Sequence, residues 1–264
     1  MLKTALGILL TAFTVVIPAA CRRSATPGGV LETPYPITDN LGNSREYRIY
    51  VPDRADGRAL PMLVYFHGVM SPDFRKIPSL KGYTGSPVEE TDLISFCSER
   101  RIVLVVPKAF YTYTFLNCPS SGWLTDKELD GVEKIIDEVA EREGIDGKRI
   151  YLAGISAGAV FCHFLANHRP ERYAGLISHS QAYVSPGGEV LKPAVPGPGF
   201  GIVFCYNAGD YKNLIRFCVD SERIYREAGY RTALLPDLPP VGHAWSSSSN
   251  ERLWKWLRRL ERKG

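Results

Sequence analysis

Seven short apolar stretches recur along the chain and predict the strands of a sheet. Several are continuous apolar runs, as expected for strands that are covered on both faces. The first stretch alternates apolar and polar residues instead, which favours an antiparallel edge hairpin. The predicted strands are 46–51, 62–66, 102–106, 149–153, 174–178, 201–206 and 231–235.

Helical periodicity occupies the intervals between these stretches. Leu129, Val132, Ile136 and Val139 have helical spacing, and acidic residues lie on the opposite face. The predicted helices are 126–143, 157–168, 212–228 and a basic terminal segment within 252–263. Because strands and helices alternate, we expect an α/β fold with a mostly parallel central sheet and helices on both faces.

The chain has 264 residues, of which 45% are hydrophobic, and this is enough for one large domain with a substantial core. No internal linker is long enough to indicate a second domain. We therefore predict a single domain over 31–264, preceded by a flexible tether at 21–30 that contains "RRSATPGGV".

Residues 1–20 have the pattern of an export signal. Lys3 provides a positive start, an apolar segment follows, and small residues precede Cys21. The segment resembles a bacterial lipoprotein signal, which implies lipidation of Cys21 and a cell-envelope location. Pro18 departs from that pattern, because an aliphatic residue is usual there, so free secretion is the alternative. Either way we expect an extracytoplasmic protein, and the only membrane contact we expect is through a possible N-terminal lipid anchor.

The distribution of charge argues against nucleic-acid binding, and the number of cysteines limits the possible disulfides. The formal net charge is +4 with both signs spread along the chain, and the basic segment 252–263 is better explained as a solvated helix face than as a nucleic-acid site. Cys97, Cys118, Cys162, Cys205 and Cys218 are five in number, so one at least is free if Cys21 is lipidated and no intermolecular bridge forms. No motif for a metal or cofactor is present, and we expect none.

Reactive side chains follow the predicted strands. His67-Gly68-Val69 follows 62–66, and "GISAG" with Ser156 follows 149–153. "NAGD", ending at Asp210, follows 201–206, and "GHAW" with His243 comes after the last strand. Ligands bind beyond the carboxyl ends of parallel strands. We therefore expect a hydroxyl, a carboxylate and an imidazole to meet there, in the chain order Ser, Asp, His.

The motifs "YFHGVM", "GIDGKRIYLAGISAGA", "YNAGD" and "GHAW" resemble those of the α/β-hydrolase superfamily, over nearly all of 31–264. Within it the chain is similar to secreted esterases related to polyhydroxybutyrate depolymerases and feruloyl esterases. Ala159 departs from the pattern, since many relatives have another glycine there. The resemblance implies a serine esterase that forms an acyl-enzyme.

The roles that follow are hypotheses. Ser156 attacks the ester carbonyl, His243 transfers the proton, and Asp210 orients His243. The backbone N–H groups of Ala157 and Val69 stabilise the oxyanion.

Each assignment has an alternative. Ser156 could cap a helix, and Asp210 could cap the helix that begins near Tyr211. Asp220 and Asp237 compete as the acid. The other histidines compete with His243, although His67, His163 and His168 are expected to be structural or exposed.

Aromatic residues in the loop 110–123 could bind substrate, because exposed rings at a cleft favour flat or apolar ligands. The predicted contacts are Tyr111, Tyr113, Trp123, His179 and Trp245. Packing of these rings onto the sheet is an equal alternative. The expected substrate is a small-molecule or polymer ester, with carbohydrate-linked, phenolic or polyester groups as candidates. A serine peptidase or amidase, or a non-catalytic binding protein on a hydrolase scaffold, are the alternatives.

Overall fold

The computed structural model describes residues 35–53, 57–80, 82–123, 126–185, 189–191, 193–194 and 199–262. The predicted export signal, Cys21 and the tether lie outside the described residues. Within the described part, no helix is both long and apolar enough to cross a membrane.

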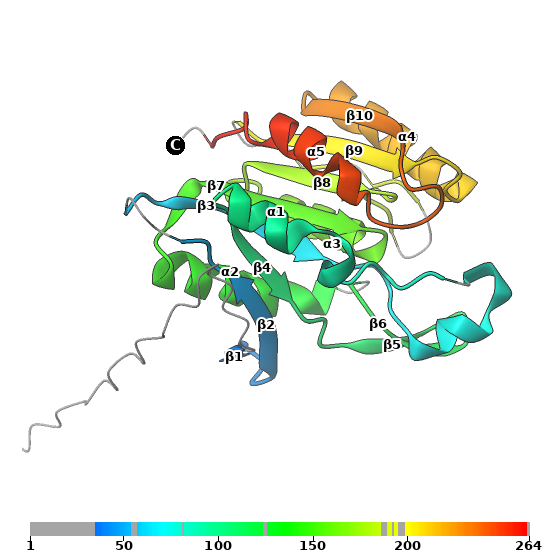
Figure 1. Ribbon diagram of the computed structural model, residues 1–264, viewed down its shortest axis with the longest axis horizontal. Coiled ribbons are helices and arrows are strands. Elements are labelled where there is room, and N and C mark those ends of the chain that lie inside the picture. The colour runs from blue at the N-terminus through cyan, green and yellow to red at the C-terminus, as the bar shows by residue number, and fades with distance from the viewer. Residues whose placement is uncertain are drawn as a thin grey trace, which may run out of the picture.

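A central sheet of eight strands organises the chain, in the order β1-β2-β4-β3-β7-β8-β9-β10 (Figure 1). β1 and β2 form an antiparallel edge hairpin and β2 pairs antiparallel with β4, whereas all other neighbours are parallel. The predicted, mostly parallel sheet is therefore confirmed. Its strands are β1 Tyr35–Thr38, β2 Ser44–Tyr50, β3 Leu60–Phe66, β4 Val103–Pro107, β7 Ile145–Ile155, β8 Gly175–His179, β9 Gly201–Asn207 and β10 Arg231–Leu238.

In the part of the chain that the structure describes, five α-helices cover the two faces of this sheet. The side chains of β3 alternate between the faces, with Val64 in the core under α2, α3 and α4 and Tyr65 in the core under α1 and α5. Figure 1 shows α1 and α5 together in front of the sheet, with the other three helices behind it. The helices are α1 Leu93–Glu99, α2 Leu129–Arg142, α3 Ala157–His168, α4 Lys212–Glu227 and α5 Asn250–Leu257.

Three differences from the sequence prediction concern boundaries and short elements. The segment expected as a loop at 110–123 contains a two-stranded antiparallel hairpin, β5 Thr112–Phe115 and β6 Cys118–Ser121. Helix α1 was not predicted because its seven residues give too few turns for a periodic signal. The terminal helix lies earlier than expected and ends at Leu257.

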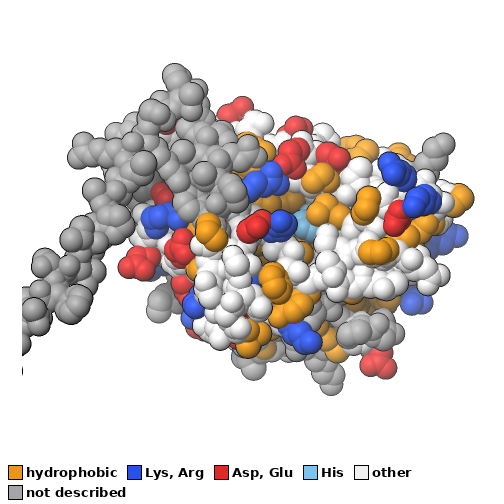
Figure 2. All heavy atoms as spheres, turned by 90° about the horizontal axis from the view of Figure 1, so that it is seen from below, with side chains coloured by type: hydrophobic (Ala, Val, Ile, Leu, Met, Phe, Trp, Pro, Cys, Tyr) orange, Lys and Arg blue, Asp and Glu red, His pale blue; other side chains and the backbone are white. Residues whose placement is uncertain are grey.

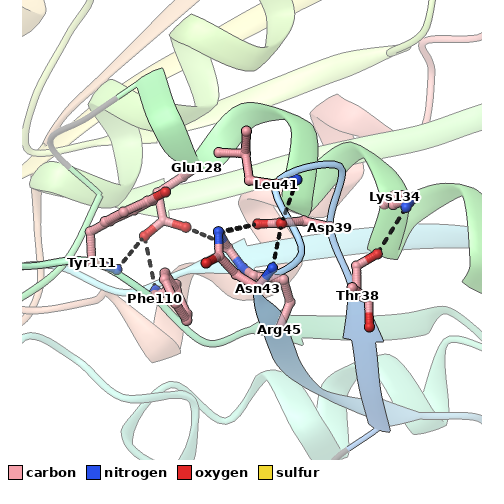
Figure 3. A network of polar contacts seen from close by, with 9 residues as sticks. All are labelled: Thr38, Asp39, Leu41, Asn43, Arg45, Phe110, Tyr111, Glu128 and Lys134. Atoms are coloured by element: carbon pink, nitrogen blue, oxygen red, sulfur yellow. Dashed lines mark hydrogen bonds and ion pairs between the residues drawn. The ribbon is translucent and has the colours of Figure 1, made fainter.

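A buried polar network ties the edge hairpin to the start of the β5–β6 segment (Figure 3). Arg45 on β2 is fully buried. It donates to Glu128 and, at a distance of 3.5 Å, to Asp39. Glu128 in turn accepts the backbone N–H groups of Phe110 and Tyr111, both at 2.9 Å. These contacts fix where the segment leaves the sheet and so the direction in which the hairpin extends.

Candidate active site

Ser156 stands at the sharp turn between β7 and α3. Its φ of +55° is in the left-handed region, which is strained for a residue with a side chain. The Ser156 N–H donates to the His179 carbonyl at 2.9 Å, which fixes the turn to the neighbouring strand β8. Its side chain forms no capping hydrogen bond with α3, so the helix-cap alternative does not describe this serine. The turn instead holds the hydroxyl at the wall of a pocket.

Two glycines make this turn sterically feasible. A Cβ on Gly154 would lie 2.4 Å from the backbone of Gly158, and one on Gly158 would lie 2.1 Å from the Phe66 carbonyl oxygen. Real Cβ atoms do not approach backbone so closely. The spacing of glycines in "GISAG" therefore reflects direct backbone contact between β7, α3 and β3.

Asp210 and His243 form a hydrogen-bonded pair beyond the ends of β9 and β10. The His243 Nδ1 and the Asp210 Oδ1 are 3.0 Å apart, and the Asp210 side chain is fully buried. The Tyr211 N–H also donates to Oδ1, at 2.7 Å. Asp210 thus accepts hydrogen bonds both from His243 and from the residue before α4. Its predicted role as the acid and its alternative role as a helix cap are therefore compatible.

Electrostatics keep Asp210 ionised. Burial alone would raise the pKa of its carboxyl, but hydrogen bonds from His243, Ser180 and the Tyr211 N–H outweigh burial and lower that pKa below its usual value. The rival carboxylates lie elsewhere: Asp220 is inside α4, and Asp237 is exposed on β10. Of the three candidates, only Asp210 is hydrogen-bonded to His243.

Asn207 holds the loop that carries His243. Its Nδ2 donates to the Gly242 carbonyl at 2.9 Å and to the Ala244 carbonyl at 2.7 Å, so it is hydrogen-bonded to both residues that flank His243. Sequence reasoning did not single out Asn207, although it begins the "NAGD" motif. The signal in the sequence was the position of an amide side chain directly after the apolar strand 201–206, because a polar group that becomes buried at a strand end must find hydrogen-bond partners.

The neighbouring strand end supplies Ser180 and His179. Ser180 contributes a hydrogen bond that lowers the pKa of Asp210, and its own φ of +54° marks a second tight turn. His179 is fully buried, with its ring stacked on Trp245 at a centroid distance of 5.2 Å. Burial, and to a lesser degree the charge on His243, lowers the pKa of His179 to about 3, so this imidazole stays neutral. It packs beneath the site.

Val69 and Ala157 line the same pocket wall as Ser156. The N–H groups on either side of Val69 are engaged: Gly68 donates to the Gly85 carbonyl at 2.7 Å and Met70 to the Ser121 carbonyl at 2.9 Å. The loop after β3 is therefore fixed from both sides. Ala157 is the first residue of α3, where backbone N–H groups lack intrahelical partners. Both residues thus lie at the wall where the predicted oxyanion donors would be needed.

The remaining histidines have structural environments. His163 is fully buried between the Tyr225 hydroxyl at 2.8 Å and the Ser178 hydroxyl at 2.9 Å, and burial lowers its pKa to about 3. His67 is buried beside the Gly68 carbonyl, 2.6 Å from Nδ1, and burial lowers its pKa to about 4. His168 is exposed at the end of α3. These positions agree with the expectation that the three histidines are structural or exposed.

The pocket at Ser156 has a volume of about 640 Å³ and is lined mainly by apolar side chains. His243 lines it as well, together with Tyr83 and Tyr211. Among the lining residues, all from the described part of the chain, none is Lys, Arg, Asp or Glu. The aliphatic and phenylalanine side chains of its walls, apart from Val69 and Ala157, are Leu80, Phe115, Leu116, Val160, Phe164, Val184, Leu214 and Phe217.

The aromatic residues expected to contact substrate do not line this pocket. Trp123 and Trp245 are buried, with Trp123 packed edge-on against Phe66 at 5.0 Å and Trp245 against Tyr65 at 5.2 Å. The Tyr113 hydroxyl lies under the Val69 loop, 2.6 Å from a Cβ built on Gly122, and the Tyr111 N–H is bonded to Glu128. Packing, the alternative given for these rings, therefore describes Trp123, Trp245 and Tyr113, whereas Phe115 and Leu116 line the pocket.

A second cavity of about 470 Å³ lies near the sheet edge, lined by His67 and by charged residues of β2. Figure 2 shows the face of the molecule seen from below, where acidic and basic side chains are interspersed and hydrophobic ones form small groups.

The five described cysteines are buried free thiols. Within the described residues no cluster of three His, Cys, Asp or Glu side chains could hold a metal ion.

Comparisons with known proteins identify the architecture. No protein-family model matches the chain, and no curated protein matches it either. Among solved structures, the S-formylglutathione hydrolase from Agrobacterium tumefaciens is similar with a TM-score of 0.63 and 14% identity, over 89% of this chain and 97% of that one. A ferulic acid esterase is similar with a TM-score of 0.57 and 14% identity, over 86% of this chain and 97% of that one.

A thermostable esterase has a TM-score of 0.61 and 17% identity over 88% of this chain, and the match spans 63% of that esterase's length. At such identities the likeness concerns the fold. Together with the sheet order and the Ser–Asp–His arrangement, it shows that the chain has the α/β-hydrolase fold.

Proposed function

We propose that this protein is a serine hydrolase of uncharged, largely apolar carboxylic esters. The observation that carries the proposal is the meeting of the strained Ser156 turn and the His243–Asp210 pair at one apolar pocket. A serine in this backbone conformation, at the same pocket as an oriented imidazole, has the features that nucleophilic catalysis requires.

The mechanism follows from the hydrogen bonds. With Nδ1–H donated to Asp210, His243 keeps Nε2 as the free base. Nε2 takes the Ser156 proton while Oγ bonds to the ester carbonyl carbon, and the carbonyl oxygen becomes anionic beside the Val69 and Ala157 N–H groups. His243 then gives the proton to the leaving alcohol as the ester bond breaks. Water attacks the acyl-enzyme by the same route and releases the acid.

The pocket walls support an uncharged substrate. The described residues that line the pocket include no Lys or Arg that could pair with a carboxylate, and burying an unpaired charge there is costly. Glutathione carries charged groups, so the thioester substrate named for the similar S-formylglutathione hydrolases fits this pocket poorly. Phenolic esters, short aliphatic esters and polyester segments fit it better, and a carbohydrate-linked ester fits if its acyl group enters the pocket.

A panel of substrates tests this proposal. The purified protein is assayed with p-nitrophenyl acetate, butyrate and octanoate, methyl ferulate, a 3-hydroxybutyrate oligomer, acetylated xylose, S-formylglutathione and peptide p-nitroanilides. We expect turnover of apolar esters and little of the glutathione thioester. Turnover of the anilides instead would favour a peptidase, the activity that is suggested in the name of a similar putative dipeptidyl aminopeptidase from Bacteroides ovatus.

Ser156→Ala identifies the nucleophile. We expect a loss of kcat on the order of 10⁶-fold and no labelling by a fluorophosphonate probe. Ser248→Ala, which changes an exposed serine, is the matched control and keeps both activity and labelling. Wild-type protein that neither reacts with the probe nor turns over any ester would instead support a non-catalytic binding protein.

The N-terminal segment extends the proposal to the cell envelope. The pattern of residues 1–20 supports export, with lipidation at Cys21 or free secretion as the two outcomes. Intact-mass measurement of the protein from its native membrane fraction distinguishes them, since lipidation adds the mass of the acyl chains to a chain that begins at Cys21.

A further inference from the structure

The Tyr83 hydroxyl lies among the reacting groups of the candidate site. A Cβ built on Gly68 would lie 2.3 Å from the Tyr83 oxygen and 3.2 Å from the Ser156 Cβ. The absence of a side chain at Gly68 therefore leaves the space in which the phenol approaches Ser156. Tyr83 also lines the pocket beside Ser156 and Ala157. Sequence reasoning gave no signal for this tyrosine, because "KGYTGS" reads as an ordinary turn.

The ring of Tyr83 is held on both sides. It stacks on His243 at a centroid distance of 5.1 Å and on the buried Phe74 at 6.0 Å, with an interplanar angle of 30° in both cases. A residue that packs against His243 and reaches Ser156 spans the two groups between which the proton must move.

The backbone around Tyr83 is anchored. The Tyr83 N–H donates to the Leu80 carbonyl at 2.9 Å, and the Gly85 carbonyl accepts the Gly68 N–H at 2.7 Å. One residue further, the Ser86 carbonyl accepts the Tyr65 hydroxyl at 2.7 Å and the Ser86 hydroxyl accepts the Trp245 N–H at 3.0 Å. The phenol is thus positioned by β3 and by the loop of His243, and both belong to the site.

We propose that Tyr83 is a further catalytic residue, whose phenol donates a hydrogen bond to the oxyanion beside the Val69 and Ala157 N–H groups. This inference rests on the proposed ester hydrolysis at Ser156. The phenol lies beside Ser156 and the Val69 backbone, close to where the carbonyl oxygen of an ester would sit. A bound ester takes that position, and the phenol turns its O–H toward the new oxygen.

The protonation state of Tyr83 agrees with a donor role. Burial raises its pKa to about 12, even though hydrogen bonds with Ser156 and the Val69 backbone act in the opposite direction. The phenol therefore keeps its proton at neutral pH. It exchanges no proton in the reaction, since Ser156 delivers its own proton to His243, and it contributes only a hydrogen bond that strengthens as charge develops on the carbonyl oxygen.

Tyr83→Phe tests the proposal because it removes the O–H and leaves the ring on His243 and Phe74. With p-nitrophenyl butyrate we expect kcat to fall about 10²-fold with KM nearly unchanged, the signature of an interaction made in the transition state. The shape of the pH profile stays as in wild type, since no titrating group is lost. Tyr206→Phe, which removes a phenol outside the pocket, is the matched control.

A transition-state mimic gives an independent measurement. A trifluoromethyl ketone adds to Ser156 and creates an oxyanion, so its inhibition constant should rise in Tyr83→Phe by about the same factor as kcat falls. The proposal is overturned if kcat is unchanged or increases, as for a tyrosine that merely obstructs the site, or if only KM changes. Fluorophosphonate labelling and thermal melting of Tyr83→Phe separate these outcomes from loss of the Ser156 chemistry and from unfolding.

Discussion

Arg45 and Glu128 are paired with both side chains fully buried, although 83 positions separate them in the sequence. The pair joins β2, the inner strand of the edge hairpin, to the residue directly before α2, and a Cβ on Gly131 would lie 2.8 Å from the guanidinium carbon of Arg45. The guanidinium also faces the Phe110 ring at 5.0 Å. The buried ion pair therefore holds β2 against the start of α2, and it leaves no space for a side chain at position 131.

Glu128→Ala should destabilise the domain by roughly 3–5 kcal/mol, because it leaves Arg45 buried with only the more distant Asp39 carboxylate. It also removes the acceptor of two backbone N–H groups. Urea unfolding measures the effect. Glu46→Ala breaks an exposed pair with Lys108 and should cost less than about 1 kcal/mol. Equal losses in the two variants would contradict this account.

Asp210→Asn should reduce kcat by about 10⁴-fold, since an amide can no longer hold the Nδ1–H tautomer of His243. Thermal stability should change much less than activity. Asp237→Asn is the control, because this exposed aspartate was the rival acid and asparagine tolerates its φ of +53°. If Asp237→Asn lost activity and Asp210→Asn kept it, the assignment of the acid would be reversed.

Gly158→Ala should cost roughly 4 kcal/mol or more, or prevent folding, because the new methyl would lie 2.1 Å from the Phe66 carbonyl oxygen. Gly147→Ala has no heavy atom within 4 Å of its Cβ and should be nearly neutral. Thermal denaturation and soluble yield of the two variants give the comparison, and a well-folded Gly158→Ala would show that the turn can relax.

Stability should fall as pH drops from about 6.5 to 4, owing to His67, His163 and His179. Their folded pKa values are lowered to about 4, 3 and 3 from 6.5, so in this window the unfolded chain binds protons that the folded chain does not. The sign is therefore loss of stability with falling pH, at up to about 1.4 kcal/mol per pH unit for each histidine.

Urea unfolding at several pH values measures this slope. His163→Gln should flatten it, because it removes one of the three groups, while replacement of the exposed His168 should leave it unchanged. A slope that is the same in His163→Gln as in wild type would show that this imidazole does not titrate as described.

Leu214→Trp should restrict the pocket. A larger side chain on this wall takes up volume that a longer acyl chain would need, so kcat/KM should fall more for p-nitrophenyl octanoate than for the acetate. Val219→Trp, on the outer face of the same helix α4, should leave the chain-length preference unchanged. An equal loss for both esters in Leu214→Trp would indicate a general disturbance.

The fold was predictable because its signals are local. Apolar runs such as 62–66 and 201–206 are covered on both faces, and the helix at 157–168 has the predicted bounds. The glycine spacing around Ser156 is visible in the sequence, and the structure shows that backbone packing requires it. Asp210 and His243 follow strand ends whose position the parallel sheet dictates.

What could not be predicted depends on contacts between distant segments. Trp123 lies in the loop after a predicted strand and Trp245 lies two residues after His243, but packing against Phe66 and Tyr65 buries both rings away from the pocket. Tyr83 enters the site from a turn whose path is set by Gly68, Ser86 and Trp245. No periodicity records such an arrangement, because each partner comes from a different part of the chain.

The five buried thiols give the folded domain a built-in reporter of its own opening. Burial raises the pKa of Cys97, Cys162, Cys205 and Cys218, so these sulfurs are both inaccessible and poorly nucleophilic while the sheet is intact. A small alkylating reagent followed by mass spectrometry would therefore count molecules that have transiently opened, segment by segment, without any added label.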